Sequence, residues 1–425
     1  MIRSQKMAIF QSRRKDILVK GTSGIQILTD GKVYFDAISG IFNMPFGYSC
    51  APIIDRVKES FDNYPFHPKD HFYTDKYLEV AKDLLGASGY VTGGILFLNS
   101  GSEGVEAAIS MALQKHRLSG EKRKCRIIAR AHSYHGATLG ARSVTGRNNF
   151  GDLIAEGFET IRIPPPFKDY QGDQGVTFDV DEIESLILRE NPSSIAAFIF
   201  EPVNHLKGMQ QSSAAYMRGI RSLCDKYNII MIADEIISGM YRTGSFLYAH
   251  IHDVLPDIVV IGKGISSGYA PVSAVIASAA VTDSFAGDSH WRSFSHSHTY
   301  AANPVGLTAV QATYQHFHTE RVNEHFDGLA TRFRRQIDEL RQVAGVVRAD
   351  AVGLLAGINL DHSIGEATGK AIEDLCFDRG VIVRGEENWM TLAPSYNTEF
   401  EQLDHICSVV GEAINEVVSN ASGTL

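Results

Sequence analysis

The sequence has little cysteine, no excess of positive charge and no long apolar run, and each absence excludes a class of protein. Its five cysteines are scattered and odd in number, and no two of them form a Cys-x-x-Cys pair. This usage predicts reduced thiols in a cytoplasmic protein and argues against a disulfide framework or a cysteine zinc site. Lysine and arginine number 40 against 49 aspartates and glutamates, for a net charge of −9. That balance argues against nucleic acid or an anionic membrane bound by a basic face.

The apolar residues are spread through the chain in short segments. No run reaches the ~18 residues of a membrane-spanning helix, and the first six residues have no apolar segment after their charges. We therefore expect neither a membrane protein nor a secretory signal. Apolar residues still make up 44% of the 425 residues. A chain of this length buries about three-quarters of its surface on folding, which predicts a large core that needs no disulfides.

Short apolar runs alternate with helical patterns in the middle of the chain, which is typical of an α/β protein with a mainly parallel sheet. The clearest runs are 94–98, 126–130, 196–200, 229–233 and 258–261. Before them, a glycine-punctuated alternation at 24–36 indicates a hairpin, and after them an amphipathic pattern at 321–343 indicates a long helix. We predict an N-terminal segment at 1–60, a large domain at 61–309 and a small C-terminal domain at 310–425.

Polar residues or glycines follow each of these runs directly. They bring hydroxyls at 100 and 102, an aromatic ring at 134, acids at 201 and 234, and a lysine at 263. Because ligands of an open parallel sheet bind at the carboxyl ends of its strands, we expect these residues to converge on one site. This convergence, more than any single motif, predicts an enzyme.

The first strand end, Ser100-Gly-Ser-Glu103, opens a strong helix pattern. The free amides and the positive dipole end of a helix N-terminus attract phosphate, and Gly101 would let an anion approach the backbone. The alternative is an ordinary capping box, with Ser100 as the N-cap and Glu103 three residues later. Taken alone, this segment favours the cap.

Three further strand-end residues each allow a structural and a chemical interpretation. Asp234 ends a buried run and needs a cationic partner, although a single acid there is more often a structural cap. Lys263 is either a solvated lysine or a partly buried amine that forms a Schiff base with a carbonyl. Tyr134 is either a core aromatic or a flat surface for a planar ring. PLP, pyridoxal 5′-phosphate, is the ligand that fits all of these features together. It needs a phosphate site, an acid for its pyridinium nitrogen, an aromatic ring that stacks on it and a reactive amine.

From about residue 20 to about residue 410 the sequence resembles the class III (ω-type) aminotransferases of fold type I. The matching motifs, in the family's order and spacing, are 99–103, 134–138, 201–203, 234–239 with 242–244, 263–269 and 299–304. The resemblance implies an α/β fold with a large, mainly parallel-sheet domain and a smaller α+β domain built from both chain ends. It also implies a PLP-dependent transaminase that moves an amino group from an amino-acid donor to a carbonyl acceptor by ping-pong chemistry.

The resemblance further implies roles for single residues around the cofactor ring. Lys263 would carry the Schiff base and, as a free amine, would move a proton between the substrate and the cofactor. Asp234 would keep the ring nitrogen protonated. Tyr134 would cover one face of the ring and Ile236 the other.

The resemblance assigns the cofactor phosphate to two subunits. Gly101 and Ser102 would bind it within one chain, and Thr299 would reach the phosphate of the neighbouring subunit, which implies a homodimer with shared sites.

No metal is expected, because the histidines at 132–135 and 296–298 have no acid or cysteine partners at ligand spacing.

Departures from the family pattern bear on the substrate. Relatives that use glutamate carry a switching Glu where this sequence has Leu206, and the family's carboxylate-binding arginine corresponds to Arg384. An arginine in an apolar pocket is costly unless it meets an anion. Without a resident partner, Arg384 is expected to favour donors with one carboxylate, alanine before glutamate, unless the histidine and lysine that flank Leu206 rebuild an anion site. Ile41 and Phe42 fall at pocket positions of relatives and predict an apolar entrance.

The motifs leave two alternatives to a transaminase. An aminomutase, a racemase or a decarboxylase of the same family would share them. Residues 264–268 also match the G-x-S-x-G elbow of serine hydrolases, with Ser266 as the nucleophile. That elbow requires a helix after the turn, whereas Pro271 and a strand pattern at 272–277 follow here, which argues against a hydrolase.

Overall fold

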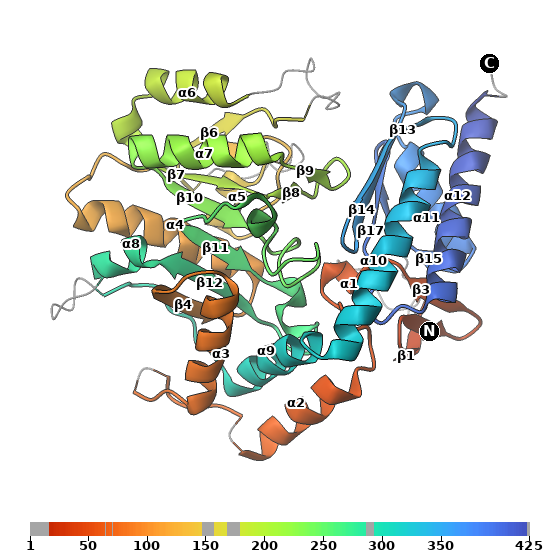
Figure 1. Cartoon of the computed structure of the whole chain (residues 1–425), viewed down its shortest axis with the longest axis horizontal. Helices are drawn as coiled ribbons and strands as arrows, with labels where there is room; N and C mark the ends of the chain where they lie inside the picture. The colour runs from red at the N-terminus through yellow and green to blue at the C-terminus, as the bar shows by residue number, and fades with distance from the viewer. Residues whose placement is uncertain are drawn as a thin grey trace, which may run out of the picture.

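The computed structural model describes residues 17–63, 65–69, 71–146, 157–167, 179–285 and 293–422. The start of the chain, for which the sequence predicts no secretory signal, lies outside these residues. A larger body surrounds a seven-stranded sheet, and a smaller body of strands and long helices lies beside it (Figure 1). Within the described ranges, no helix has both the length and the apolar content needed to cross a membrane.

The seven-stranded sheet has the strand order β4-β12-β11-β10-β7-β5-β6. Its strands are β4 (Gly93–Leu98), β5 (Arg126–Arg130), β6 (Thr160–Ile163), β7 (Ile195–Phe200), β10 (Ile230–Asp234), β11 (Ile258–Ile261) and β12 (Ser273–Ser278). Only β12 runs antiparallel to its neighbours, and the other adjacent strands are parallel. The five predicted runs and the strand pattern at 272–277 are confirmed, whereas β6 was not predicted.

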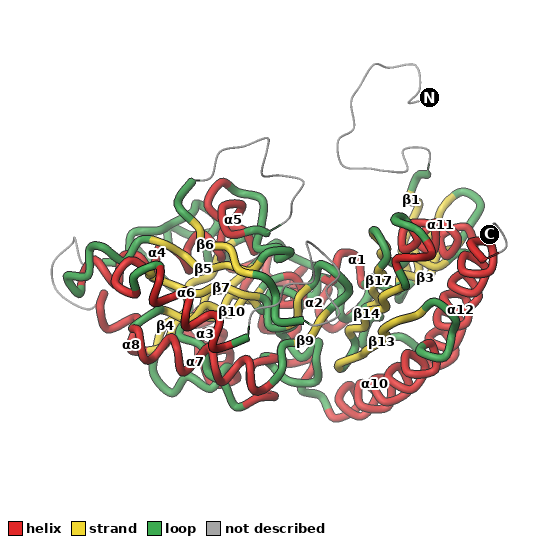
Figure 2. The backbone as a smooth tube through the Cα atoms, turned by 90° about the horizontal axis from the view of Figure 1, so that it is seen from above, coloured by secondary structure: helices red, strands yellow, loops and turns green. Residues whose placement is uncertain are grey.

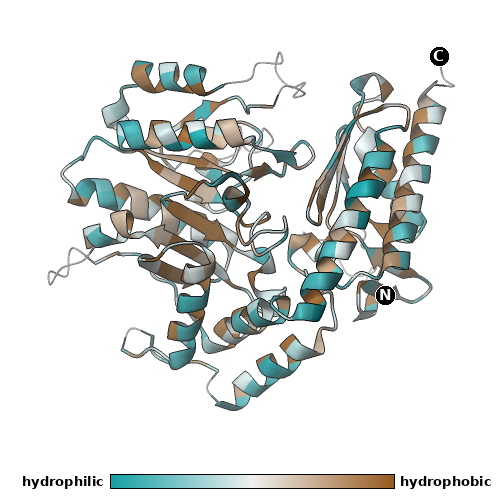
Figure 3. Ribbon diagram, viewed as in Figure 1, coloured by the Kyte–Doolittle hydropathy of each residue, from teal (hydrophilic) through white to brown (hydrophobic). Residues whose placement is uncertain are grey.

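Helices cover both faces of this sheet (Figure 2). They are α3 (Asp75–Ala87), α4 (Gly101–Leu118), α5 (Leu139–Val144), α6 (Val180–Arg189), α7 (Ala214–Tyr227), α8 (Ala279–Thr282) and α9 (Pro304–Phe317). Helix α2 (Ala51–Asn63) packs on α9 instead, and its buried Ile53 belongs to the core of the smaller body. Successive strand residues point to opposite faces, so Ile127 packs in the cluster with α4 and Ile128 in the cluster with α6 and α7. Strands buried on both faces are apolar almost throughout, as the brown sheet between striped helices in Figure 3 shows.

Both chain ends contribute to the smaller body. Its first sheet has the order β1-β2-β3-β15, so the predicted hairpin at 24–36 is confirmed and pairs with a strand from the C-terminal part. These elements are β1 (Val19–Ser23), β2 (Gln26–Thr29), β3 (Val33–Asp36), β15 (Val381–Ile382) and the short α1 (Ser39–Phe42). The pairing shows that both chain ends belong to the smaller body. The predicted limits at residues 60 and 310, which fall inside α2 and α9, remain our proposal for the domain boundaries.

The second sheet of the smaller body, with the order β13-β14-β17-β16, carries three helices. The elements are α10 (Glu320–Leu340), β13 (Val346–Val352), β14 (Leu355–Leu360), α11 (Thr368–Asp378), β16 (Arg384–Glu386), β17 (Trp389–Leu392) and α12 (Phe400–Ser422). The long helix predicted at 321–343 is α10. A small hairpin, β8 (Val203–Asn204) with β9 (Gln210–Gln211), joins the two bodies, because Asn359 of β14 donates a hydrogen bond to the backbone oxygen of Lys207 in its turn.

Candidate active site

One pocket collects residues from the carboxyl ends of five strands, as the sequence predicts. It is lined by Ser100, Gly101, Ser102, Tyr134, His135, Gly136, Glu201, Asp234, Ile236, Ile237 and Lys263. About 590 Å³ of space outside the protein atoms, part of it open to solvent, lies within it, which is the usual size of a small-molecule site. The predicted site residues that the fold brings together here are Gly101, Ser102, Tyr134, Asp234, Ile236 and Lys263.

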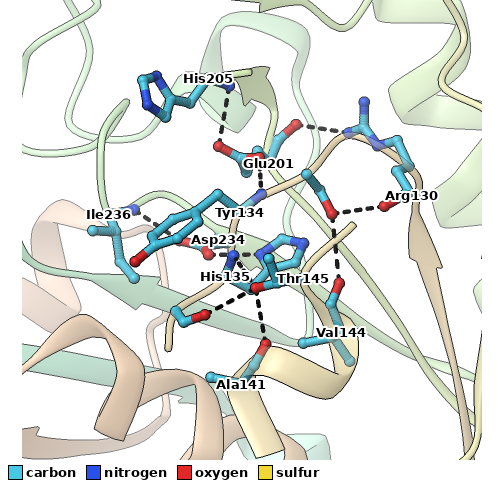
Figure 4. Close-up of polar contacts among 12 residues, drawn as sticks. Arg130, Tyr134, His135, Ala141, Val144, Thr145, Glu201, His205, Asp234 and Ile236 are labelled. Carbon is cyan, nitrogen blue, oxygen red and sulfur yellow. Dashed lines mark hydrogen bonds and ion pairs between the residues drawn. The ribbon is translucent and has the colours of Figure 1, made fainter. Parts of the chain in front are cut away.

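Asp234 lies at the carboxyl end of β10 with its side chain held on both sides (Figure 4). One carboxylate oxygen, Oδ2, is 2.8 Å from Nδ1 of His135, and Oδ1 accepts a hydrogen bond of 3.1 Å from the amide of Ile236. The residue is 4% exposed, so it needs such partners. One of these partners is a histidine ring nitrogen. The sequence shows this histidine only as a neighbour of Tyr134, and its role was missed.

Lys263 begins a short 3₁₀ helix directly after β11, the strand beside β10. Its φ of 45° is in the left-handed region, which costs a residue with a Cβ on the order of 1 kcal/mol and aims the side chain into the pocket. Burial lowers the pKa of the Lys263 amine. The charge of Arg384 also lowers this pKa, while Asp234 and Glu201 raise it. A lowered pKa increases the share of neutral amine, the form that acts as a nucleophile or base.

Glu201, at the end of β7, connects two parts of the site (Figure 4). Its Oε1 accepts a hydrogen bond of 2.9 Å from the amide of Tyr134, and its Oε2 accepts one of 3.1 Å from the amide of His205 in the β8–β9 hairpin. Burial raises the pKa of Glu201 to about 7. The sequence singled out this acid as a strand end but assigned it no role.

The N-terminus of α4 forms one wall of the pocket. Ser100 is the N-cap, since its hydroxyl oxygen accepts a hydrogen bond from the amide of Glu103, and the predicted cap is confirmed. The full capping box does not form, because Glu103 accepts from the amide of Asn99 instead of that of Ser100. A Cβ on Gly101 would lie 2.6 Å from Cδ1 of Ile236. Glycine therefore keeps this helix end open to an anion while the cap is in place.

Four predicted site residues, Thr299, Ile41, Phe42 and Arg384, do not line this pocket. Thr299 is exposed in the turn before α9, and Ile41 is 64% exposed. Phe42 is buried instead and packs against the ring of His205, with the ring centroids 5.2 Å apart. The predicted apolar entrance and the predicted contact of Thr299 with a neighbouring subunit therefore stay predictions.

Arg384 has a resident partner, so the prediction that it lacks one is wrong. Its Nη2 donates a hydrogen bond of 2.7 Å to Oε1 of Glu386. The physical reason is the strand period of two, which places side chains two residues apart on the same face. Leu206 is buried, as an apolar residue should be, and the neighbouring Lys207 forms an ion pair with Glu387.

Neither a hydrolase elbow nor a histidine metal site matches the geometry of the described residues. Ser266 is buried in the 3₁₀ helix, where its hydroxyl donates a hydrogen bond of 2.5 Å to the backbone oxygen of Ala270, and strand β12 follows. It is no exposed nucleophile on a strand–turn–helix elbow. His296 and His298 place ring nitrogens 3.1 Å apart. Among the described residues, however, no three His, Cys, Asp or Glu side chains are grouped so as to hold a metal ion.

Comparisons with known proteins agree with this geometry. A family model described as aminotransferase class-III matches residues 10–414. A beta-alanine–pyruvate aminotransferase from Pseudomonas aeruginosa is 28% identical over 403 residues, which cover 92% of this chain and 90% of the relative. An omega-aminotransferase from Caulobacter vibrioides is 28% identical over 418 residues, which cover 95% of each chain. The crystal structure of a PLP-bound aminotransferase mutant from Vibrio fluvialis has the same fold, with a TM-score of 0.89 and 23% identity over 99% of this chain and 98% of that one.

The family match includes every motif on which the resemblance rests, from residue 99 to residue 304. The predicted family, the α/β fold of type I, the transaminase activity and the cofactor PLP are therefore confirmed. The chain belongs to the class-III aminotransferases, a family of PLP-dependent enzymes.

Proposed function

We propose that Lys263 and Asp234 are the catalytic residues of this transaminase and that PLP binds between them. The observation that carries the proposal is their placement in one pocket, at the ends of the adjacent parallel strands β11 and β10. A neutral amine suits the aldehyde of the cofactor, and a buried carboxylate suits its protonated ring nitrogen. The two side chains therefore match the two ends of the same small ring.

The remaining pocket residues fit the rest of the cofactor. Gly101 and Ser102 begin α4, whose free amides and positive dipole end suit a phosphate. Gly101 leaves that helix end open, because a Cβ there would press against Ile236. Tyr134 and Ile236 both line the pocket, and we propose that they cover the two faces of the ring.

The chain's own residues hold and move protons during the reaction. When bound, PLP supplies an electron sink for the substrate's α-carbon. Burial lowers the pKa of the Lys263 amine, so that it can act as a base. The amine would take the proton from the substrate's α-carbon and pass it to the cofactor. Asp234 keeps the ring nitrogen protonated. His135 holds Asp234 in place and leaves acceptor capacity on both carboxylate oxygens.

Substrate, assembly and location are proposed from fewer observations. Arg384, although it pairs with Glu386, would bind the substrate carboxylate, and the proposed donor is an amino acid with one carboxylate, such as alanine. A keto acid such as the pyruvate in the name of the Pseudomonas relative is the matching acceptor. The entrance to the pocket would be formed by Ile41 and Phe42.

A homodimer is supported by the exposed aromatic residues near Thr299, which include Phe72, Tyr73 and Tyr300. An apolar surface of this kind marks a protein interface. In the dimer, Thr299 would reach the phosphate of the neighbouring site. A cytoplasmic location is supported by the five cysteines, all of which are free thiols.

The test is chemical labelling of the purified holoenzyme. Borohydride reduction followed by peptide mass spectrometry should place a pyridoxyl group on Lys263, and Lys263→Ala should remove both the visible cofactor band and the label. A phosphonate label on Ser266 would instead support a hydrolase. Incubation with an amino donor alone should convert the cofactor to its pyridoxamine form, which an aminomutase, racemase or decarboxylase does not accumulate. A label on any other lysine would contradict the proposal.

A further inference from the structure

The strand β16 presents two charged side chains toward the active site. Arg384 and Glu386 share one face of the strand, while Gly385 packs on α11 from the other face, where a Cβ would lie 1.9 Å from the backbone oxygen of Gly369. In the antiparallel register Glu386 is opposite Trp389, so their side chains lie on the same face.

That face is turned toward the pocket through the β8–β9 hairpin. The ring of Trp389 lies 6.0 Å from the ring of His205, and the amide of His205 donates a hydrogen bond to Glu201 in the pocket wall. The charge of Arg384 also reaches the amine of Lys263, whose pKa it lowers. The face that carries Arg384 and Glu386 is therefore within electrostatic range of the reacting groups.

The guanidinium of Arg384 is paired with Glu386 on one edge, while Nε on the other edge is unpaired among the described residues. Nη2 donates to Oε1 of Glu386 at 2.7 Å, and the two side chains are only 26% and 17% exposed. Nε of Arg384 is buried and has no hydrogen-bond partner within the described parts of the chain. A buried donor without a partner is costly, so a substrate carboxylate that reaches Nε would gain a hydrogen bond that Glu386 does not supply.

We propose that Glu386 is the counter-ion that sets the substrate range of Arg384, an inference that rests on the proposed carboxylate-binding role of this arginine. With a substrate that has no carboxylate, Glu386 neutralises the guanidinium, so no uncompensated charge faces an apolar group. With a substrate that has one, two carboxylates share a single positive charge, which weakens the binding of the substrate. Glu386 is thus a positioning residue that widens the range of donors and lowers the preference for amino acids.

The experiment compares two donors in the half-reaction of the holoenzyme, followed by the loss of the visible cofactor band. Alanine carries a carboxylate, and 1-phenylethylamine does not. We expect Glu386→Gln to raise the ratio of the two second-order rate constants in favour of alanine by about fivefold to thirtyfold, the range of a partly shielded charge-assisted hydrogen bond. Glu387→Gln is the matched control, because it removes the same charge one residue away, where the partner is Lys207, and the ratio should not change.

The possible outcomes separate this inference from the proposal on which it rests. If Glu386→Gln slows both donors equally, or leaves the ratio unchanged while Arg384→Ala still slows alanine, the role of Glu386 is overturned and that of Arg384 stands. If Arg384→Ala leaves alanine unaffected, the carboxylate-binding role fails and the inference fails with it. In the Arg384→Ala background, Glu386→Gln should no longer change the ratio, and a remaining change would show that Glu386 acts by another route.

Discussion

Replacement of Asp234 by asparagine tests the proposed electrostatic centre of the site. Asparagine keeps the size of the side chain, and its Oδ1 can still accept the hydrogen bond from the amide of Ile236. The loss of the bond to His135 costs about 1 kcal/mol of folding stability, so the protein should fold. What is lost is the negative charge, and a charge-assisted bond to the ring nitrogen is about twice as strong as a neutral one. Removal of one preorganised electrostatic partner lowers kcat by about 100- to 1000-fold.

The assay for Asp234→Asn has three readings on the same preparation. Thermal unfolding should change little, a titration with PLP should still show binding, and the half-reaction with alanine should slow by the factor above. Asp257→Asn is the control. Like Asp234, Asp257 has defined partners, because it accepts a hydrogen bond from the amide of Met231 and pairs with Arg221. It lies before β11, at the opposite end of the strands from the pocket. This variant should lose stability and keep its half-reaction rate. A near-normal rate in Asp234→Asn would refute the role of this carboxylate.

Two further predictions concern the arginine and the buried glutamate. Arg384→Ala should raise the KM for alanine by about 10- to 150-fold, the equivalent of ~1.5–3 kcal/mol for hydrogen bonds to a charged group. Steady-state kinetics measure this change. An unchanged KM with unchanged PLP binding would show that the arginine has only a structural role. Burial raises the pKa of Glu201 to about 7. Between about pH 4.5 and 7 the folded protein therefore keeps a proton on this residue that the unfolded chain releases. The stability that this group contributes falls as the pH rises through that window. Glu201→Gln should therefore gain stability relative to the wild type by up to about 3 kcal/mol between pH 5 and pH 8 in urea unfolding, and parallel pH profiles would contradict the raised pKa.

The location of the site could be predicted from the sequence because it depends on local signals. Apolar runs bounded by polar residues mark strands, and a parallel sheet brings their carboxyl ends to one edge. Tyr134, Asp234 and Lys263 are therefore predicted to meet, and the pocket contains all three. The resemblance to the class-III aminotransferases adds their chemistry, since the motifs recur in one order and spacing.

The partners of these side chains could not be predicted in the same way. Asp234 and Glu235 are adjacent in sequence, yet only Asp234 enters the pocket, while Glu235 accepts hydrogen bonds from the amides of Tyr248 and Ala249 behind the sheet. His135 meets Asp234 across 99 residues of sequence. Contacts of this length follow from the order of the strands, and no local pattern encodes that order.

The strands, their polar ends and the residue types that suit PLP could be predicted without a structure, because short-range periodicity and composition decide these features. The pairing of Arg384 with Glu386 had a local signal as well, the strand period of two, but that signal applies only once residues 384–386 are known to form a strand. Tertiary structure alone decided that β16 forms beside β17, that its charged face is turned toward the β8–β9 hairpin, and that Lys263 lies within reach of the charge of Arg384. The physical reason is that burial and long-range packing determine which charges remain paired and which donors stay open for a substrate.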